Sequence, residues 1–89
     1  MKAVLAIIGK DSTGILAKVS TCCAEHDVNI IEISQTVMNQ YFTMIMLTDI
    51  DRLNISFNCF ADLMSELGRK NGLEIHTMHE DIFKSMHNV

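Results

Sequence analysis

The residues best suited to binding chemistry lie in the segment 9–17, which reads Gly-Lys-Asp-Ser-Thr-Gly-Ile-Leu-Ala. Asp11, Ser12 and Thr13 are all suitable N-cap residues for a helix that begins after them, and the first backbone N–H groups of a helix attract anions because they lack intrahelical partners. Gly14 has no Cβ, so a ligand could approach the backbone closely. The Asp11 carboxylate could accept a cation nearby. A site for an anion beside a site for a cation suits an amino-acid zwitterion.

One alternative is that this turn binds nothing, because turns rich in Gly, Ser, Thr and Asp are common between strands and helices that have no ligand. A phosphate site is not supported. No Lys follows Gly14 as a P-loop requires, and the G-x-G-x-x-G spacing is absent. The turn therefore predicts either a zwitterion site or an ordinary strand-to-helix connection, and it argues against a nucleotide-binding fold.

Other clusters of reactive side chains favour structural roles. Cys22 and Cys23 are adjacent on a helix, so they point about 100° apart and cannot hold a tetrahedral metal without further ligands. The odd spacing of His76 and His79 places them on opposite faces of a strand. An acylphosphatase would share the order of elements, but its chemistry needs a cationic cradle, and the first loop offers only Lys10. We therefore predict no catalytic residue, no metal site and no cofactor.

The composition excludes several function classes. The chain has 89 residues, 48% of them hydrophobic and 20% charged, which suits one globular domain rather than a disordered segment. Its net charge is −4 and its seven Lys and Arg residues are scattered, so we expect no binding to nucleic acid or to a membrane surface. The apolar run 3–8 is too short for a membrane span or a signal peptide, and three cysteines cannot form a closed disulfide framework. We expect a cytoplasmic protein with free thiols.

The periodicity of the apolar residues predicts four strands and two helices. They are a strand at 2–8, a helix that begins after Gly14 and ends near 26–27, strands at 28–40 and 41–48, a helix from about 56 to 71, and a strand at 73–78. This order predicts an α+β fold of the ferredoxin-like type, β-α-β-β-α-β, with an antiparallel four-stranded sheet and two helices on one face. Residues 1–80 form this domain. Residues 81–89 form a C-terminal tail that brings Ile82, Phe83 and Met86 together if it is helical.

The strand expected at 28–40 alternates between apolar and polar residues. Ile31, Ile33 and Val37 are predicted to share one face. The polar residues of the opposite face are Glu32, Ser34, Thr36 and Gln40. This alternation predicts a strand with one covered face.

Two helices cover only one face of such a sheet, but the strands at 2–8 and 41–48 are apolar on both faces. A large exposed apolar sheet is unusual in a soluble monomer. We therefore predict a homodimer or a larger homo-oligomer that uses the second face, an edge strand or the tail.

On these residues the chain resembles the ACT domain family, whose members are small ferredoxin-like regulatory modules that often bind amino acids. The resemblance covers nearly the whole chain and rests on Gly9-x-Asp11-x-x-Gly14-Ile15-Leu16-Ala17, on Val19, and on Asn29-Ile30 followed by Gln35. The sequence is most similar to the stand-alone, single-module ACT proteins, and its segments 80–83 and 86–87 also resemble that subgroup.

The resemblance implies a ligand site built by the loop before the first helix and the start of the second strand, often across a subunit interface. Carried over, this site comprises Asp11, Ser12, Thr13 and Gly14 of one subunit with Asn29 and Ile30 of the same or a neighbouring subunit. Many family members have Arg-Pro where this chain has Ser12-Thr13, so a guanidinium contact and a rigid turn are missing here. Asn29 carries a donor and an acceptor that suit a carboxylate or an ammonium group. The alternative role for Asn29 is to cap the end of the preceding helix.

We therefore expect a cytoplasmic ACT-type module that dimerises, senses an amino acid or a related small metabolite, and transmits its occupancy to a partner protein. The alternative is a ligand-free scaffold of the same fold that oligomerises or docks another protein. Neither interpretation requires an enzymatic activity.

Overall fold

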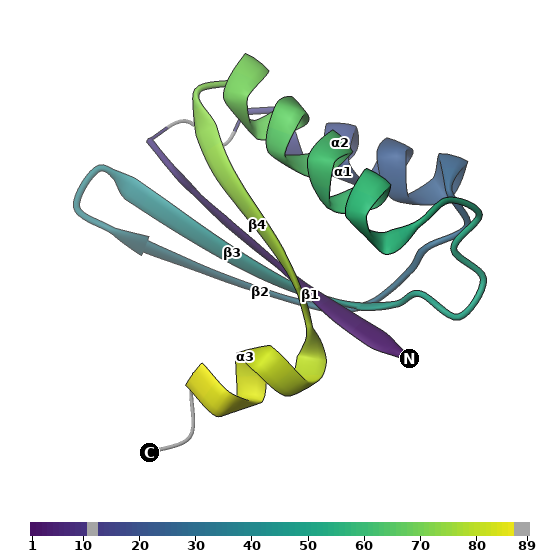
Figure 1. Cartoon of the computed structure of the whole chain (residues 1–89). Coiled ribbons are helices and arrows are strands. Elements are labelled where there is room, and N and C mark those ends of the chain that lie inside the picture. Colours follow the sequence, from purple (N-terminus) through teal and green to yellow (C-terminus); the bar gives the residue numbers. More distant parts are fainter. Residues whose placement is uncertain (11–12, 87–89) are drawn as a thin grey trace.

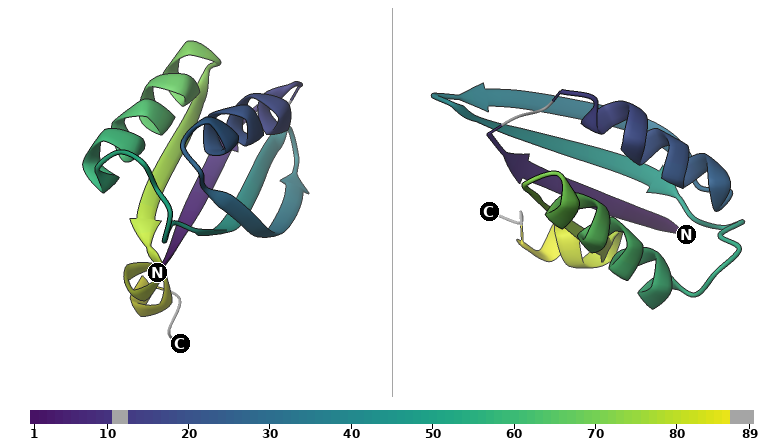
Figure 2. Two further views of the ribbon diagram at one scale, coloured as in Figure 1. Left: turned by 90° about the vertical axis from the view of Figure 1, so that its right-hand side faces the viewer. Right: turned by 90° about the horizontal axis from the view of Figure 1, so that it is seen from above.

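A computed structural model describes residues 1–10 and 13–86 of the chain. The elements in order are β1 (Lys2–Gly9), α1 (Ile15–Glu25), β2 (Asn29–Met38), β3 (Tyr41–Asp49), α2 (Phe57–Lys70), β4 (Leu73–His79) and α3 (Glu80–Met86). The four strands form one sheet in the order β2-β3-β1-β4, and every neighbouring pair is antiparallel. Helices α1 and α2 lie side by side on one face of this sheet (Figures 1 and 2). The predicted ferredoxin-like fold is confirmed.

The core lies between the sheet and these two helices. Ala3, Leu5 and Ile7 alternate onto the helix face of β1, and each is fully buried at 0% exposure. The helices supply the other half of the core with Ile15, Val19 and Cys23 from α1 and Phe60 and Met64 from α2, each 1% exposed or less. Steps of four residues place each helical set on one stripe. The apolar periodicity of the sequence thus explains the two-layer core.

Residues that tolerate a left-handed backbone mark two of the reversals. The hairpin between β2 and β3 turns at Asn39 and Gln40, as predicted, and Asn39 has φ 57°. Asparagine is one of the few residues other than glycine that adopts this conformation readily. Gly72, with φ 70°, lies between α2 and β4, where the sequence predicted the end of the helix.

The predicted faces of β2 were wrong at one position. Ile30 pairs with Thr48 and Glu32 with Leu47, so Ile31 is an extra residue in a β-bulge. Because the bulge shifts the alternation by one residue, Ile30 lies on the helix face with Ile33, and Ile31 does not. Sequence alternation alone cannot reveal such a shift.

The second face of the sheet is covered in part by the chain itself. Helix α3 follows β4 directly and lies on the side of the sheet away from α1 and α2 (Figure 1). It covers Val4, which is 2% exposed, and a cavity of about 190 Å³ lies between α3 and the strands beside Phe83. Ile8, at the other end of β1, remains 39% exposed. None of the described helices is both long and apolar enough to span a membrane.

Candidate functional site

The turn that leads into α1 is open above its glycine. Gly14 is the N-cap residue, with φ 73° and ψ −2°, and the Lys18 N–H donates to its carbonyl oxygen at 3.1 Å. Apart from Gly14 and its two chain neighbours, no heavy atom of the described residues lies within 4 Å of a Cβ atom added at Gly14. Backbone conformation, rather than packing, therefore requires glycine here, and the described residues leave open space where a side chain would start. Asp11 and Ser12 lie outside the described residues, and Thr13 is exposed.

The electrostatics at this end of α1 favour an anion. Gly14 has no side chain with which to cap the helix, and the first turn of α1 contains no acidic residue. Partial positive charge from the first backbone N–H groups is therefore not offset within that turn. Lys10 adds a full positive charge nearby, with its Nζ 5.6 Å from the centroid of the Tyr41 ring. A carboxylate is the kind of group that this end of the helix can bind.

The other predicted ligand residues, Asn29 and Ile30, lie at the opposite end of the sheet. Asn29 pairs with Asp49, which pairs with Lys2 at the start of β1, whereas the loop that contains Gly14 follows the end of β1. The length of β1 separates the two ends by roughly 23 Å at the usual rise of an extended strand. One chain therefore does not bring the two halves of the predicted site together.

The end of α1 is capped by a residue that the sequence analysis did not single out. The Asn54 side-chain amide donates to the Glu25 carbonyl oxygen at 3.2 Å, and its Oδ1 lies 2.9 Å from His26 Nδ1. Asn54 thus fills the capping role considered for Asn29, whose side chain is exposed. No local pattern could have found this contact, because Asn54 lies in the loop before α2.

Strand β2 forms a bare edge of the sheet. Among the described strands it pairs only with β3, so one side of its backbone is unpaired. Its exposed apolar residues are Ile31 (46%), Ile33 (42%), Val37 (66%) and Met38 (70%). An edge strand with apolar side chains is a surface on which a second strand can pair.

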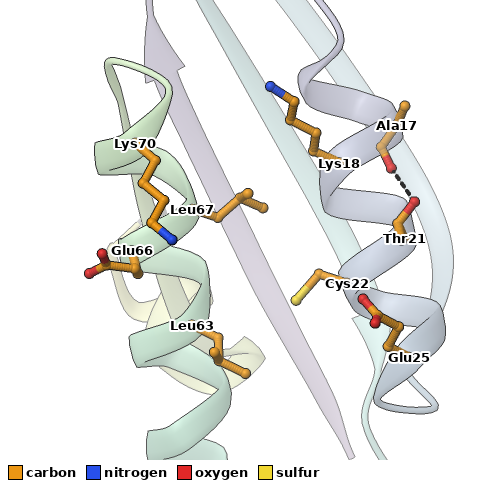
Figure 3. A pocket seen from close by; sticks show the side chains of 9 residues that line it. All are labelled: Ala17, Lys18, Thr21, Cys22, Glu25, Leu63, Glu66, Leu67 and Lys70. Carbon is orange, nitrogen blue, oxygen red and sulfur yellow. Dashed lines mark hydrogen bonds between the residues drawn. The ribbon is translucent and has the colours of Figure 1, made fainter.

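A groove runs between the outer sides of α1 and α2, and the sequence analysis did not predict it (Figure 3). Its volume is about 460 Å³, and its lining residues are Ala17, Lys18, Thr21, Cys22, Glu25, Leu63, Glu66, Leu67 and Lys70. Lys18 Nζ donates to Asn71 Oδ1 at 2.6 Å, which links the two helices at one end of the groove. The one signal of this groove in the sequence is Leu63, an apolar residue that lies outside the stripe of α2 formed by Phe60, Met64 and Leu67.

The thiols and imidazoles do not form a reactive centre in the described part of the chain. Burial and the nearby Glu25 carboxylate raise the pKa of Cys22, and burial raises the pKa of Cys23 to about 12, so both thiols are protonated at neutral pH. His76 and His79 pair with Ala6 and Ala3 and lie on opposite faces of β4, as their spacing predicted. The described residues include no cluster of three or more His, Cys, Asp or Glu that could hold a metal.

Comparison with known proteins identifies the relatives of this chain. A family model described as "ACT domain" matches residues 2–77. A UPF0237 protein of Clostridium perfringens is 47% identical over the full length of both chains. The solved structure of an ACT domain protein from Streptococcus pneumoniae is 36% identical, covers 94% of each chain, and has a TM-score of 0.81. A formyltetrahydrofolate deformylase from Pseudomonas syringae is 26% identical with a TM-score of 0.76, and the match spans 88% of this chain but 27% of that one.

Proposed function

Because the chain belongs to the ACT domain family, we propose that it is a cytoplasmic regulatory module that binds an amino acid or a related small metabolite at the interface of a homodimer. The observation that carries this proposal is the bare apolar edge of β2. A dimer with a two-fold axis across this edge would pair β2 with its own copy in the antiparallel sense.

This pairing would complete the site that one chain leaves divided. Antiparallel pairing of two β2 strands sets the start of one beside the end of the other, so Asn29 of the partner subunit comes next to Met38. Met38 lies at the same end of the sheet as Gly9 and the turn that leads to α1. The two halves of the predicted site, far apart within one chain, would then meet across the interface.

The chemistry of the two halves suits a zwitterion. The first turn of α1 attracts the carboxylate, and the open space beside Gly14 lets the ligand approach the backbone. The Asn29 carboxamide oxygen of the partner subunit accepts from the ammonium group, together with the Asp11 carboxylate. A ligand held by both subunits favours one dimer geometry in proportion to its differential affinity for the two states, and a partner protein reads that geometry.

A thermal-shift screen against the standard amino acids tests this proposal. We expect one of them to raise Tm selectively, because a ligand at about 100 times its Kd stabilises the folded state by about 2.7 kcal/mol. Gly14→Asn should abolish the shift, because asparagine tolerates the left-handed backbone but fills the space beside it. Gly72→Asn is the matched control, since Gly72 has φ 70° and equally open surroundings outside the site.

Asn29→Ala should also abolish the shift if the partner subunit contributes to the site. A shift that survives both Gly14→Asn and Asn29→Ala in folded protein would contradict the proposed site. No shift with any amino acid would favour the second candidate function, a ligand-free docking scaffold. The groove between α1 and α2 is the observation that supports that second candidate.

A further inference from the structure

The groove between α1 and α2 has the dimensions and lining of a site for one face of a helix. From Ala17 to Glu25 it runs along about 12 Å of α1, which is about two helical turns. Cys22, Leu63 and Leu67 point into it and form its apolar floor (Figure 3). Leu63 is 41% exposed, so nothing in the described chain covers this floor completely.

The charges around the groove differ at its two ends. The helices are antiparallel, so Lys70 near the end of α2 lies at the opposite end of the groove from Glu25 at the end of α1 (Figure 3). Lys18, at the same end as Lys70, donates to the neutral Asn71 side chain and keeps its positive charge, whereas Glu66 points away from the groove and pairs with Arg69 (Figure 3). Within the described chain, neither Lys70 nor Glu25 has an ion-pair partner. The groove therefore offers two cations, Lys18 and Lys70, at one end and the anion Glu25 at the other.

We propose that this groove binds an amphipathic helix of a partner protein. Its apolar face covers Leu63 and Leu67, an acidic residue lies beside Lys70, and a basic residue about two turns away lies beside Glu25. The proposal rests on the regulatory function proposed above, and it specifies the kind of surface by which the partner protein would bind the module. The groove lies on the helix layer, away from the β2 edge, so it stays open in the proposed dimer.

Stapled helical peptides, with leucines at i, i+3, i+4 and i+7, provide the probes because short isolated helices are marginal in water. One peptide has Glu at one end and Lys at the other, a second has Glu at both ends, and a third has Lys at both. A helical peptide can lie in a groove between antiparallel helices in either chain direction. Differences in affinity among the three peptides therefore report how well their end charges match those of the groove. Fluorescence anisotropy without added amino acids measures their affinities.

We expect saturable binding of the Glu/Lys peptide and an affinity roughly threefold lower for each mismatched charge. Lys70→Glu should remove the preference for the Glu/Lys peptide over the all-Lys peptide, because the introduced carboxylate offsets the charge of Lys18 at that end. Glu25→Lys should make the all-Glu peptide the tightest ligand, because both ends of the groove are then positive. Leu63→Glu should lower the affinity of all three peptides by roughly tenfold or more, because it places a charge on the apolar floor of the groove. Ile82→Glu, on the exposed side of α3, is the matched control and should leave the affinities unchanged.

Three results would overturn the proposal. They are no binding of any peptide, equal affinities for all three peptides, or affinities that Leu63→Glu leaves intact. Self-association of the chain that Leu63→Glu abolishes would also overturn it, since the occupant would then be a second copy. The peptide measurements do not depend on the amino-acid screen. A result that contradicts helix binding in the groove can therefore be distinguished from a result that contradicts amino-acid binding at the dimer interface.

Discussion

Cys22 and Cys23 are neighbours in α1, but their surroundings differ. Cys23 points into the core and is 1% exposed, whereas Cys22 points into the groove beside Leu67 and is half-buried. The step of about 100° between consecutive helical residues causes this difference. Reactivity at neutral pH is suppressed in both, because burial raises both pKa values.

The raised pKa of Cys23 predicts a loss of stability at alkaline pH. In the unfolded chain the thiol ionises near its ordinary pKa of 9.0, but in the folded chain it ionises at about 12. The unfolded state therefore loses its proton first, and the free energy of unfolding falls as pH rises from 9 toward 12. Urea titrations under reducing conditions should show that Cys23→Ala makes the fall between neutral pH and about pH 10 smaller by roughly 1 kcal/mol.

Cys59→Ala is the control for this measurement, because Cys59 is exposed. It should leave the alkaline fall unchanged. If wild type and Cys23→Ala lose stability in parallel, groups other than this thiol cause the fall.

The two long helices begin differently, and the difference separates a structural element from a candidate binding element. At the start of α2 the Ser56 Oγ accepts from the Cys59 N–H at 3.1 Å, whereas α1 begins at a glycine. Ser56→Ala should lower the free energy of unfolding by about 1 kcal/mol, because it leaves a first-turn N–H without its cap. Urea denaturation measures this loss. Ser85→Ala, on the exposed side of α3, should change stability by less than about 0.5 kcal/mol, and an equal effect of both changes would contradict the capping role.

The sequence predicts which segments form strands and helices, but it does not predict how the residues of neighbouring strands align. The four strands, the helices α1 and α2, and the Asn39-Gln40 turn follow from apolar spacing and turn residues, which act over a few positions. The bulge at Ile31 could not be predicted in this way. It depends on how β2 aligns with β3, so it is a property of the pair of strands and not of either one.

At the scale of the whole molecule, the β2 edge predicts the oligomeric state. Light scattering should give twice the chain mass of 10.0 kDa for the wild type. Val37→Lys should shift the mass toward that of a single chain, because a lysine on an edge strand opposes pairing with another strand. Ile82→Lys, an equally polar change on exposed α3, should leave the dimer intact. A dimer that tolerates Val37→Lys but not Ile82→Lys would place the interface at α3 instead.

The sequence by itself determined the four strands and the two longer helices, the ferredoxin-like order, and the family, because these depend on local periodicity and on a motif around Gly14. Only the tertiary structure decided that Asn29 lies a full strand length from that motif, that Asn54 rather than Asn29 caps α1, and that α1 and α2 leave a groove. These features arise from strand order and long-range packing, which bring together residues with no fixed spacing along the chain.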